Sequence, residues 1–175
     1  MGIFSKVKIT LDQLAENHAD LVFRSISDES LGVYVMLLRS TGENEEINER
    51  QKKEILVLEM LATTRAIQKV FTNDDEARTL LDKLYLKVYR KISEIETEQA
   101  EFEVFLNERY KAYYKTLTAD TMFSLGVGKQ FADFFLGKDV RSLAFTNTIE
   151  DIFISNINEG EKFLRGLLSK YELII

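Results

Sequence analysis

ILVLEMLATTRAI, residues 55–67, is the stretch that decides the fold of this chain. Its apolar residues fall on nearly every side of a helix, not on a single stripe. A helix that is apolar all round is buried by other elements on every side. We therefore expect a central helix over about 44–71 that is surrounded by further helices.

The rest of the chain carries the same helical signal. Proline does not occur, and apolar residues recur at spacings of three and four far more often than they alternate. No segment indicates a β-strand. The sequence therefore predicts an all-α fold, a single-domain helical bundle of five to seven helices over residues 1–175, in which residues 1–9 can form a flexible N-terminal arm.

Local signals mark several helix ends. Thr10 followed by Gln13 resembles a capping box, and Asn73 is well suited to cap the helix that follows it. Gly42 and Gly137 stand where glycine commonly ends a helix. These residues predict the boundaries between successive helices.

The most regular pattern lies over about 74–116, where neither glycine nor proline interrupts the chain. Apolar residues there are spaced alternately by four and three, with polar members at a few positions, which is a heptad seam. We expect one long helix, with a kink near 93–97 as the alternative because the stretch there is charged. The seam comprises Leu81, Tyr85, Val88, Ile92, Ile95, Gln99, Phe102 and Leu106, and continues to Arg109 and Tyr113.

Charge is divided along this helix. Basic residues dominate its first part and glutamates the part that follows. Two copies crossing antiparallel between Ile92 and Ile95 would place each basic part beside the other copy's acidic part. The hypothesis is an isologous homodimer through the seam. The alternative is that the seam packs on this chain's own helices while the charges face water, where ion pairs contribute little.

Composition excludes several classes of function. The chain has no cysteine, so disulfides and thiolate chemistry are absent, and a cytoplasmic location fits best. The net charge of −6 is spread evenly, so no basic region exists for nucleic-acid binding. The apolar runs are far shorter than the roughly 20 residues of a membrane span.

Residues 124–130, SLGVGKQ, resemble part of a phosphate-binding loop. Such a loop needs GxxxxGK[ST] between a strand and a helix. Here Phe123 stands where the first glycine belongs, and Gln130 replaces the hydroxyl that binds magnesium. We interpret Gly126 and Gly128 as points where another helix approaches closely or where the helix is weakened.

His18 is the one histidine, so any histidine chemistry must use it. It lies on the apolar side of its helix, which favours a partly buried structural residue over a catalytic one. Glutamates at helical spacing could in principle hold a hard cation, but they are more often a solvated face, so we expect neither metal nor cofactor. They are Glu45, Glu46, Glu49, Glu94, Glu98 and Glu101.

The sequence thus favours a non-enzymatic protein-interaction module, a scaffold, adaptor or regulator, that partners itself and an unidentified protein. The alternative is a ligand-binding or sensor domain, because the 12 Phe and 7 Tyr residues are concentrated after residue 84 and could surround an apolar or aromatic molecule. A catalyst using His18 and carboxylates ranks third.

Overall fold

The apolar run 55–67 lies in α3 (Glu49–Val70), the central helix of a computed structural model that describes residues 7–42, 46–95, 99–119 and 125–174. Within those residues the chain forms seven helices and a two-stranded sheet. Most side chains of α3 between Glu54 and Ile67 are buried. The predicted all-α bundle with an enclosed central helix is therefore confirmed.

The first two helices follow their predicted caps. In α1 (Leu11–Arg24) the Thr10 hydroxyl accepts from the Gln13 amide while the Gln13 side chain accepts from the Thr10 amide, a complete capping box. The next helix, α2 (Asp28–Ser40), stops just before Gly42. Gly42 has a φ of 73°, the left-handed conformation that glycine adopts at low cost.

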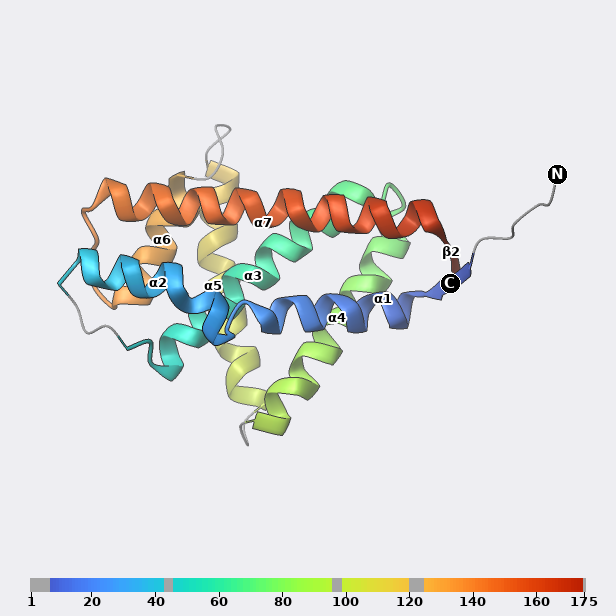
Figure 1. Ribbon diagram of the computed structural model, residues 1–175, viewed down its shortest axis with the longest axis horizontal. Helices are drawn as coiled ribbons and strands as arrows, with labels where there is room; N and C mark the ends of the chain where they lie inside the picture. Colours follow the sequence, from blue (N-terminus) through green and yellow to red (C-terminus); the bar gives the residue numbers. More distant parts are fainter. Residues whose placement is uncertain (1–6, 43–45, 96–98, 120–124, 175) are drawn as a thin grey trace.

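The expected single helix over 74–116 is wrong. The structure has two helices, α4 (Asp74–Ile95) and α5 (Gln99–Ala119). They approach each other at the ends that 96–98 connect and diverge from there as a V (Figure 1). The predicted kink region 93–97 lies partly outside the described residues. The uninterrupted heptad pattern did not exclude this arrangement, because each half of the seam can pack on other helices of the same chain.

Two further helices complete the bundle, α6 (Leu125–Leu136) and α7 (Leu143–Lys170). Gly137 follows α6 with a φ of 67°, as predicted for a terminating glycine. The final carbonyls of α6 accept hydrogen bonds from α3, since Arg50 donates to Phe134 and Phe135 and Gln51 donates to Phe135. These contacts satisfy groups that a helix end leaves without partners.

Two short strands correct the expectation of a chain without β-structure. β1 (Val7–Thr10) and β2 (Tyr171–Ile174) pair in parallel, with Val7 opposite Tyr171. VKIT alternates apolar and polar residues, whereas YELI ends on two adjacent apolar residues, and each strand is too short to stand out in the sequence. The strand also corrects part of the predicted flexible arm over 1–9. Residues 1–6 lie outside the described part of the chain.

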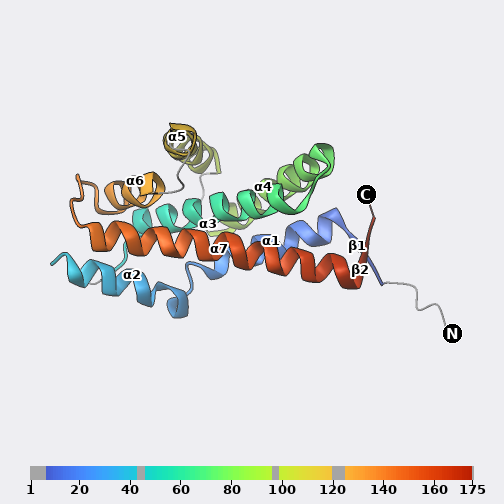
Figure 2. The same ribbon diagram turned by 90° about the horizontal axis from the view of Figure 1, so that it is seen from above.

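The helices are arranged around α3 and α7. α7 runs along the longest axis and packs on α3, while α1 packs on α4 and α6 packs on both α5 and α7 (Figure 1). Seen from above, α2 and α5 lie on opposite sides of α3 (Figure 2). The two strands close the end where α1 begins and α7 finishes. Within the described part of the chain, every helix is too short or too polar to reach across a lipid bilayer.

Candidate functional site

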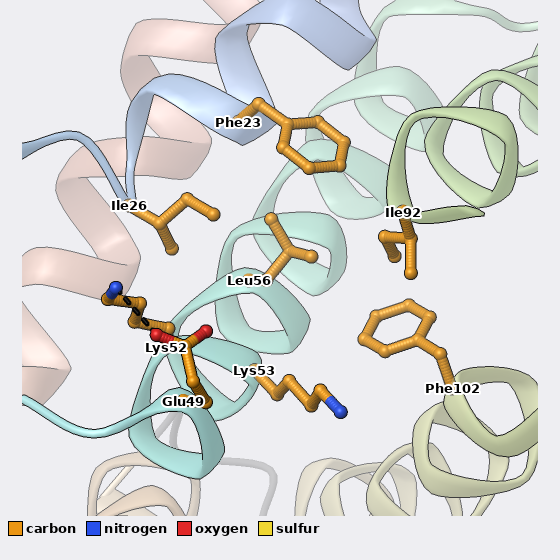
Figure 3. Close-up of a pocket in the computed structure, with 8 residues that line it drawn as sticks. All are labelled: Phe23, Ile26, Glu49, Lys52, Lys53, Leu56, Ile92 and Phe102. Atoms are coloured by element: carbon orange, nitrogen blue, oxygen red, sulfur yellow. Dashed lines mark hydrogen bonds and ion pairs between the residues drawn. The ribbon is translucent and has the colours of Figure 1, made fainter. Parts of the chain in front are cut away.

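A pocket lies near the point of the V, where α4 ends and α5 begins. Side chains from four helices and one turn line it (Figure 3). We call it the apex pocket and define it by its lining residues, Phe23, Ile26, Glu49, Lys52, Lys53, Leu56, Ile92 and Phe102. It holds about 390 Å³ when open solvent at its mouth is counted, so it is shallow and partly open.

Local folding explains why these groups meet. Phe23 is in the last turn of α1, and Ile26 is in the turn that leads to α2. The start of α3 is fixed by Asn48, whose side chain accepts from the Gln51 amide while Gln51 accepts in return. This capping box fixes the residue at which α3 begins.

The floor of the apex pocket is apolar and its rim is charged. Leu56, Ile92 and Phe102 are buried, whereas Phe23 and Ile26 are half-buried. Glu49, Lys52 and Lys53 come from the polar first turns of α3, one or two turns before Leu56. An apolar centre with a polar rim is the usual organisation of a protein-binding surface.

The rim contains one ion pair. Lys52 Nζ lies 2.8 Å from Glu49 Oε1, and this hydrogen bond raises the pKa of Lys52. Glu49 keeps 69% of its side chain exposed, so the pair is a surface one. Surface ion pairs are worth about 0–1 kcal/mol, and a partner can therefore rearrange this pair at little cost.

A buried ion pair stands elsewhere in the bundle, between α3 and α5. The carboxylate of Glu54, which is completely buried, accepts three hydrogen bonds from Arg109 at 2.8–3.0 Å. The Arg109 guanidinium also lies over the rings of Phe105 and Phe134, 4.4 and 4.1 Å from their centroids. Burial raises the pKa of Glu54, and Arg109 opposes that rise.

Two other carboxyl groups accept hydrogen bonds between helices; Glu150 is buried and Glu59 is half-buried. Asn156 donates to Glu59 at 2.5 Å, and the Gly128 amide donates to Glu150 Oε2 at 2.8 Å. Burial raises the pKa of each carboxyl to about 7. Glu150 Oε1 has no hydrogen-bond partner among the described residues. These groups join α3 and α6 to α7 and lie apart from the apex pocket lining.

The structure disperses the predicted seam. Val88, Ile92, Phe102 and Leu106 are buried within this chain, while Leu81 and Tyr85 are half-buried. Tyr85 shares hydrogen bonds with Thr64 of α3 and Tyr110 of α5. The side chains of Ile95 and Gln99 lie outside the described residues. An antiparallel dimer through one straight seam therefore does not fit this conformation, because other helices of the same chain cover many of the seam side chains.

The basic residues of α4 also find partners within the chain. Lys87 lies 3.0 Å from Asp12 and 3.2 Å from Glu16, and Lys91 lies 3.2 Å from Glu16 and 2.9 Å from Asp20. Hydrogen bonds from Lys87 lower the pKa of both Asp12 and Glu16. α1 therefore supplies acidic partners for both lysines.

The glycines of SLGVGKQ mark close helix contacts, as one of the two interpretations predicted. A Cβ at Gly126 would come within 2.8 Å of Thr116 in α5. A Cβ at Gly128 would clash with the Thr146 carbonyl and with Glu150 in α7. Lys129, the lysine of the phosphate-loop resemblance, forms ion pairs with Asp133 and Asp139 at 2.6 and 2.7 Å. Residues 120–124 lie outside the described part of the chain.

His18 is 1% exposed, as expected for a structural histidine on the apolar face of α1. Its ring meets Phe163 edge to face at 5.5 Å. Burial lowers its pKa to about 4, and its Nε2 has no hydrogen-bond partner within the described residues. The geometry gives His18 a packing contact with α7.

The glutamates considered for a hard cation are not gathered into a site in the described ranges. No cluster of three or more metal-ligating side chains occurs among the residues whose placement is described. Glu49 pairs with Lys52, and Glu46 and Glu101 are exposed. Glu45 and Glu98, and the side chain of Glu94, lie outside those residues.

Sequence reasoning missed the hydrogen-bonded carboxyl groups of α3 and the apex pocket. Glu54 and Glu59 border or interrupt an apolar run, and an acid in such a position is a signal of a buried, paired carboxylate. Phe23 and Ile26 gave no periodic signal, because one ends a helix and the other lies in a turn. Their convergence with Ile92 and Phe102 depends on the V formed by α4 and α5.

Comparisons of the chain with protein-family models, with curated proteins and with solved structures found no match. The site must therefore be interpreted from its own residues.

Proposed function

We propose that this chain is a helical protein-interaction module, a scaffold, adaptor or regulator, and that the apex pocket is its docking point for a partner protein. One observation carries the proposal. Apolar side chains from α1, α3, α4, α5 and the turn after α1 converge on a shallow, partly open hollow with a charged rim. Hollows of this kind accept the anchoring side chains that contribute most of the affinity at protein interfaces.

Affinity capture with matched variants tests the proposal. Ile26→Glu places a carboxylate at the edge of the pocket without opening the central core, since Ile26 is half-buried in a turn. Met36→Glu is the control, because Met36 is 61% exposed on α2 and does not line the pocket. We expect extract from the source cells to yield a stoichiometric partner with the wild type and Met36→Glu, and not with Ile26→Glu. Equal capture by all three proteins, or by none, would overturn the proposal.

A second copy of the chain is also a candidate partner. Ile92 and Phe102 belong to the predicted seam and line the apex pocket, so both can contribute to a dimer without separation of α4 from α1. Native mass spectrometry of the purified protein tests this form of self-association. A monomer at tens of micromolar for the wild type would exclude it. We retain the cytoplasm as the expected location because the chain has no cysteine.

A ligand-binding or sensor domain remains the alternative. The observation that favours it is that Phe23 and Phe102 supply two rings to the apex pocket. The Phe- and Tyr-rich core itself is occupied by ring contacts, such as Phe131 on Phe135 at 5.2 Å and Tyr113 on Phe134 at 5.9 Å. An apolar molecule retained by the wild-type protein in native mass spectrometry, and lost from Ile26→Glu, would favour this alternative.

A further inference from the structure

We propose that the contact between the start of α6 and the early turns of α7 is a pH-sensitive switch, in which a proton on Glu150 keeps the contact closed and loss of that proton opens it. We call this contact the Gly128 crossing and define it by Gly128, Thr146 and Glu150. The proposal is independent of the apex pocket. It depends on how closely the two helices approach and on which groups face the Glu150 carboxyl.

The two helices approach each other very closely at the Gly128 crossing. A Cβ at Gly128 would collide with the Thr146 carbonyl oxygen and would lie 2.7 Å from Glu150 Oε2. Thr146 and Glu150 are each only 5% exposed. The Glu150 carboxyl therefore lies inside the contact, and water cannot hydrate it fully while α6 and α7 stay together.

The Glu150 carboxyl receives one hydrogen bond within the described part of the chain. Its Oε2 accepts from the Gly128 amide at 2.8 Å, whereas its Oε1 is buried and has no partner among those residues. The Gly128 amide lies near the start of α6, where the helix dipole favours negative charge. One amide nevertheless replaces only part of the hydration that two carboxylate oxygens lose on burial. This environment therefore favours the neutral, protonated form of Glu150.

The charged groups beside the crossing do not compensate a carboxylate there. Lys129 follows Gly128, but its ammonium pairs with Asp133 and Asp139 at 2.6 and 2.7 Å. On α7, the negative charge of Asp151 further raises the pKa of Glu150. No basic side chain of the described residues forms an ion pair with Glu150. Ionisation would thus leave a buried negative charge without a cation.

α3 also packs on α7, and its enclosed charged groups have other partners. Arg50 donates to the final carbonyls of α6, and Glu59 accepts from an asparagine of α7. Glu54 is the informative comparison, because it is buried like Glu150 but accepts three hydrogen bonds from the guanidinium of Arg109. A cation can keep a buried carboxylate ionised, and the crossing supplies Glu150 with an amide instead.

Opening of the crossing would return Glu150 to water. Burial raises the pKa of Glu150 to about 7, and hydration would restore it toward the ordinary value of 4.5. The closed contact therefore holds a proton that the open one releases, so the contact is stabilised at low pH and loses that stability as pH rises through about 7. Gly126 and Gly128 weaken the same turns of α6, which makes local separation there less costly than unfolding of the whole protein.

NMR of the whole labelled chain tests whether Glu150 holds the proton. The Gly128 amide reports on Glu150 directly, because it donates to Glu150 Oε2. From about pH 5 to about pH 8 we expect its proton shift to follow one titration with a midpoint near 7. Glu150→Gln should remove this titration. Glu59→Gln is the matched control, because Glu59 accepts from Asn156 and does not belong to the crossing, and it should leave the titration in place.

Amide hydrogen exchange tests whether ionisation opens the crossing. The opening equilibrium constant at Gly128, corrected for the intrinsic exchange rate, should rise roughly 40-fold between about pH 5 and about pH 7. The rise should be absent from Glu150→Gln and retained by Glu59→Gln. The Leu58 amide, in the buried centre of α3, should be protected more strongly. Urea should reduce its protection more than that of Gly128, since local opening exposes less surface than global unfolding.

Three results would overturn the proposal. A Gly128 amide shift without a midpoint above about pH 5.5 would show that Glu150 is ionised within the closed contact. A rise in opening that persists in Glu150→Gln would assign the pH dependence to another group. Equal protection and equal urea dependence at Gly128 and Leu58 would show that the crossing opens only when the whole protein unfolds.

Discussion

Arg109 donates from Nε and Nη2 to the carboxylate of Glu54 at 2.8–3.0 Å, and this contact ties α5 to the central helix. Glu54 has no exposed surface, while the Arg109 side chain keeps 17%. The rings of Phe105 and Phe134 pack on the guanidinium from α5 and α6. This one ion pair therefore joins α3, α5 and α6, and substitution of its residues should change the free energy of unfolding.

Arg109→Leu should lower the free energy of unfolding by about 3–5 kcal/mol, because it leaves the buried Glu54 carboxylate without its partner. Urea denaturation measures the change. Glu49→Gln is the control, since it removes an ion pair whose glutamate is 69% exposed, and it should cost less than about 1 kcal/mol. If the two variants lost the same free energy of unfolding, the buried ion pair would be no more important for stability than the exposed one. The double variant Glu54→Leu with Arg109→Leu should recover much of the loss.

Ile92→Glu should unfold or strongly destabilise the protein and should not simply dissociate an oligomer. Ile92 is 6% exposed, so the variant would place a carboxylate in the buried interior of α4, at a cost of several kcal/mol. Light scattering combined with thermal melting separates the two effects. Leu86→Glu on the same helix is the control, since Leu86 is 65% exposed. An Ile92→Glu protein with the wild-type melting temperature and a smaller assembly would instead support the seam as a dimer interface.

The seam shows how far the sequence could predict this fold. Periodicity identified the helical segments. It also indicated that the side chains of Val88, Ile92, Phe102 and Leu106 are buried. It could not say whether a neighbouring helix or a second copy covers them, because both give the same spacing. The buried face of α4 in fact includes Leu80 and Leu84, one residue away from the predicted Leu81 and Tyr85.

The candidate site was less accessible to sequence reasoning than the fold. The caps at Thr10 and the glycines at 42 and 137 are local signals, and the structure agrees with them. The apex pocket arises from residues far apart in the chain, such as Phe23 and Phe102, whose meeting depends on tertiary packing. The parallel pairing of β1 with β2 is equally non-local, since it joins opposite ends of the described chain.

Glu16→Lys should destabilise the contact between α1 and α4. Glu16 faces Lys87, Arg90 and Lys91 at 3.2, 3.4 and 3.2 Å, so the substitution replaces attraction with repulsion at each contact. We expect a loss of roughly 1–2 kcal/mol at low salt, which decreases as salt is added because the groups are near the surface. Urea denaturation at two salt concentrations measures the effect. Lys91→Glu in the same protein should restore part of the loss, and no restoration would contradict the pairing.

The free energy of unfolding should fall as pH rises from about 5 to about 8. Burial raises the pKa of Glu59 and of Glu150 to about 7, above the value of 4.5 that a free glutamate has. Between these values the folded state retains protons that the unfolded state has released, so stability is present at low pH and is lost through about pH 7. Burial lowers the pKa of His18 from 6.5 to about 4. Between these values the unfolded state holds more protons, so His18 alone makes the free energy of unfolding rise with pH there.

Glu150→Gln isolates one carboxyl's share of this pH dependence. Glutamine keeps the shape and can still accept from the Gly128 amide, while it removes the titrating proton. Urea denaturation across the same pH range should show a shallower decline for the variant, by on the order of 2 kcal/mol over the full range. Glu101→Gln is the control, because Glu101 is exposed on α5. An unchanged pH profile for Glu150→Gln would show that Glu150 ionises normally in the folded protein.

Gly128→Ala and Gly32→Ala should change stability in opposite directions, although both glycines lie within helices. A Cβ at Gly128 would meet the Thr146 carbonyl and Glu150 of α7, and crowding of this kind costs about 1–3 kcal/mol. A Cβ at Gly32 would meet nothing within 4 Å, so alanine there should gain about 0.5–1 kcal/mol through its helix propensity. Thermal and urea unfolding of the two variants measure the difference. If Gly128→Ala were as stable as the wild type, the close approach of α6 to α7 would not need glycine, and the interpretation of GVGK as a packing motif would fail.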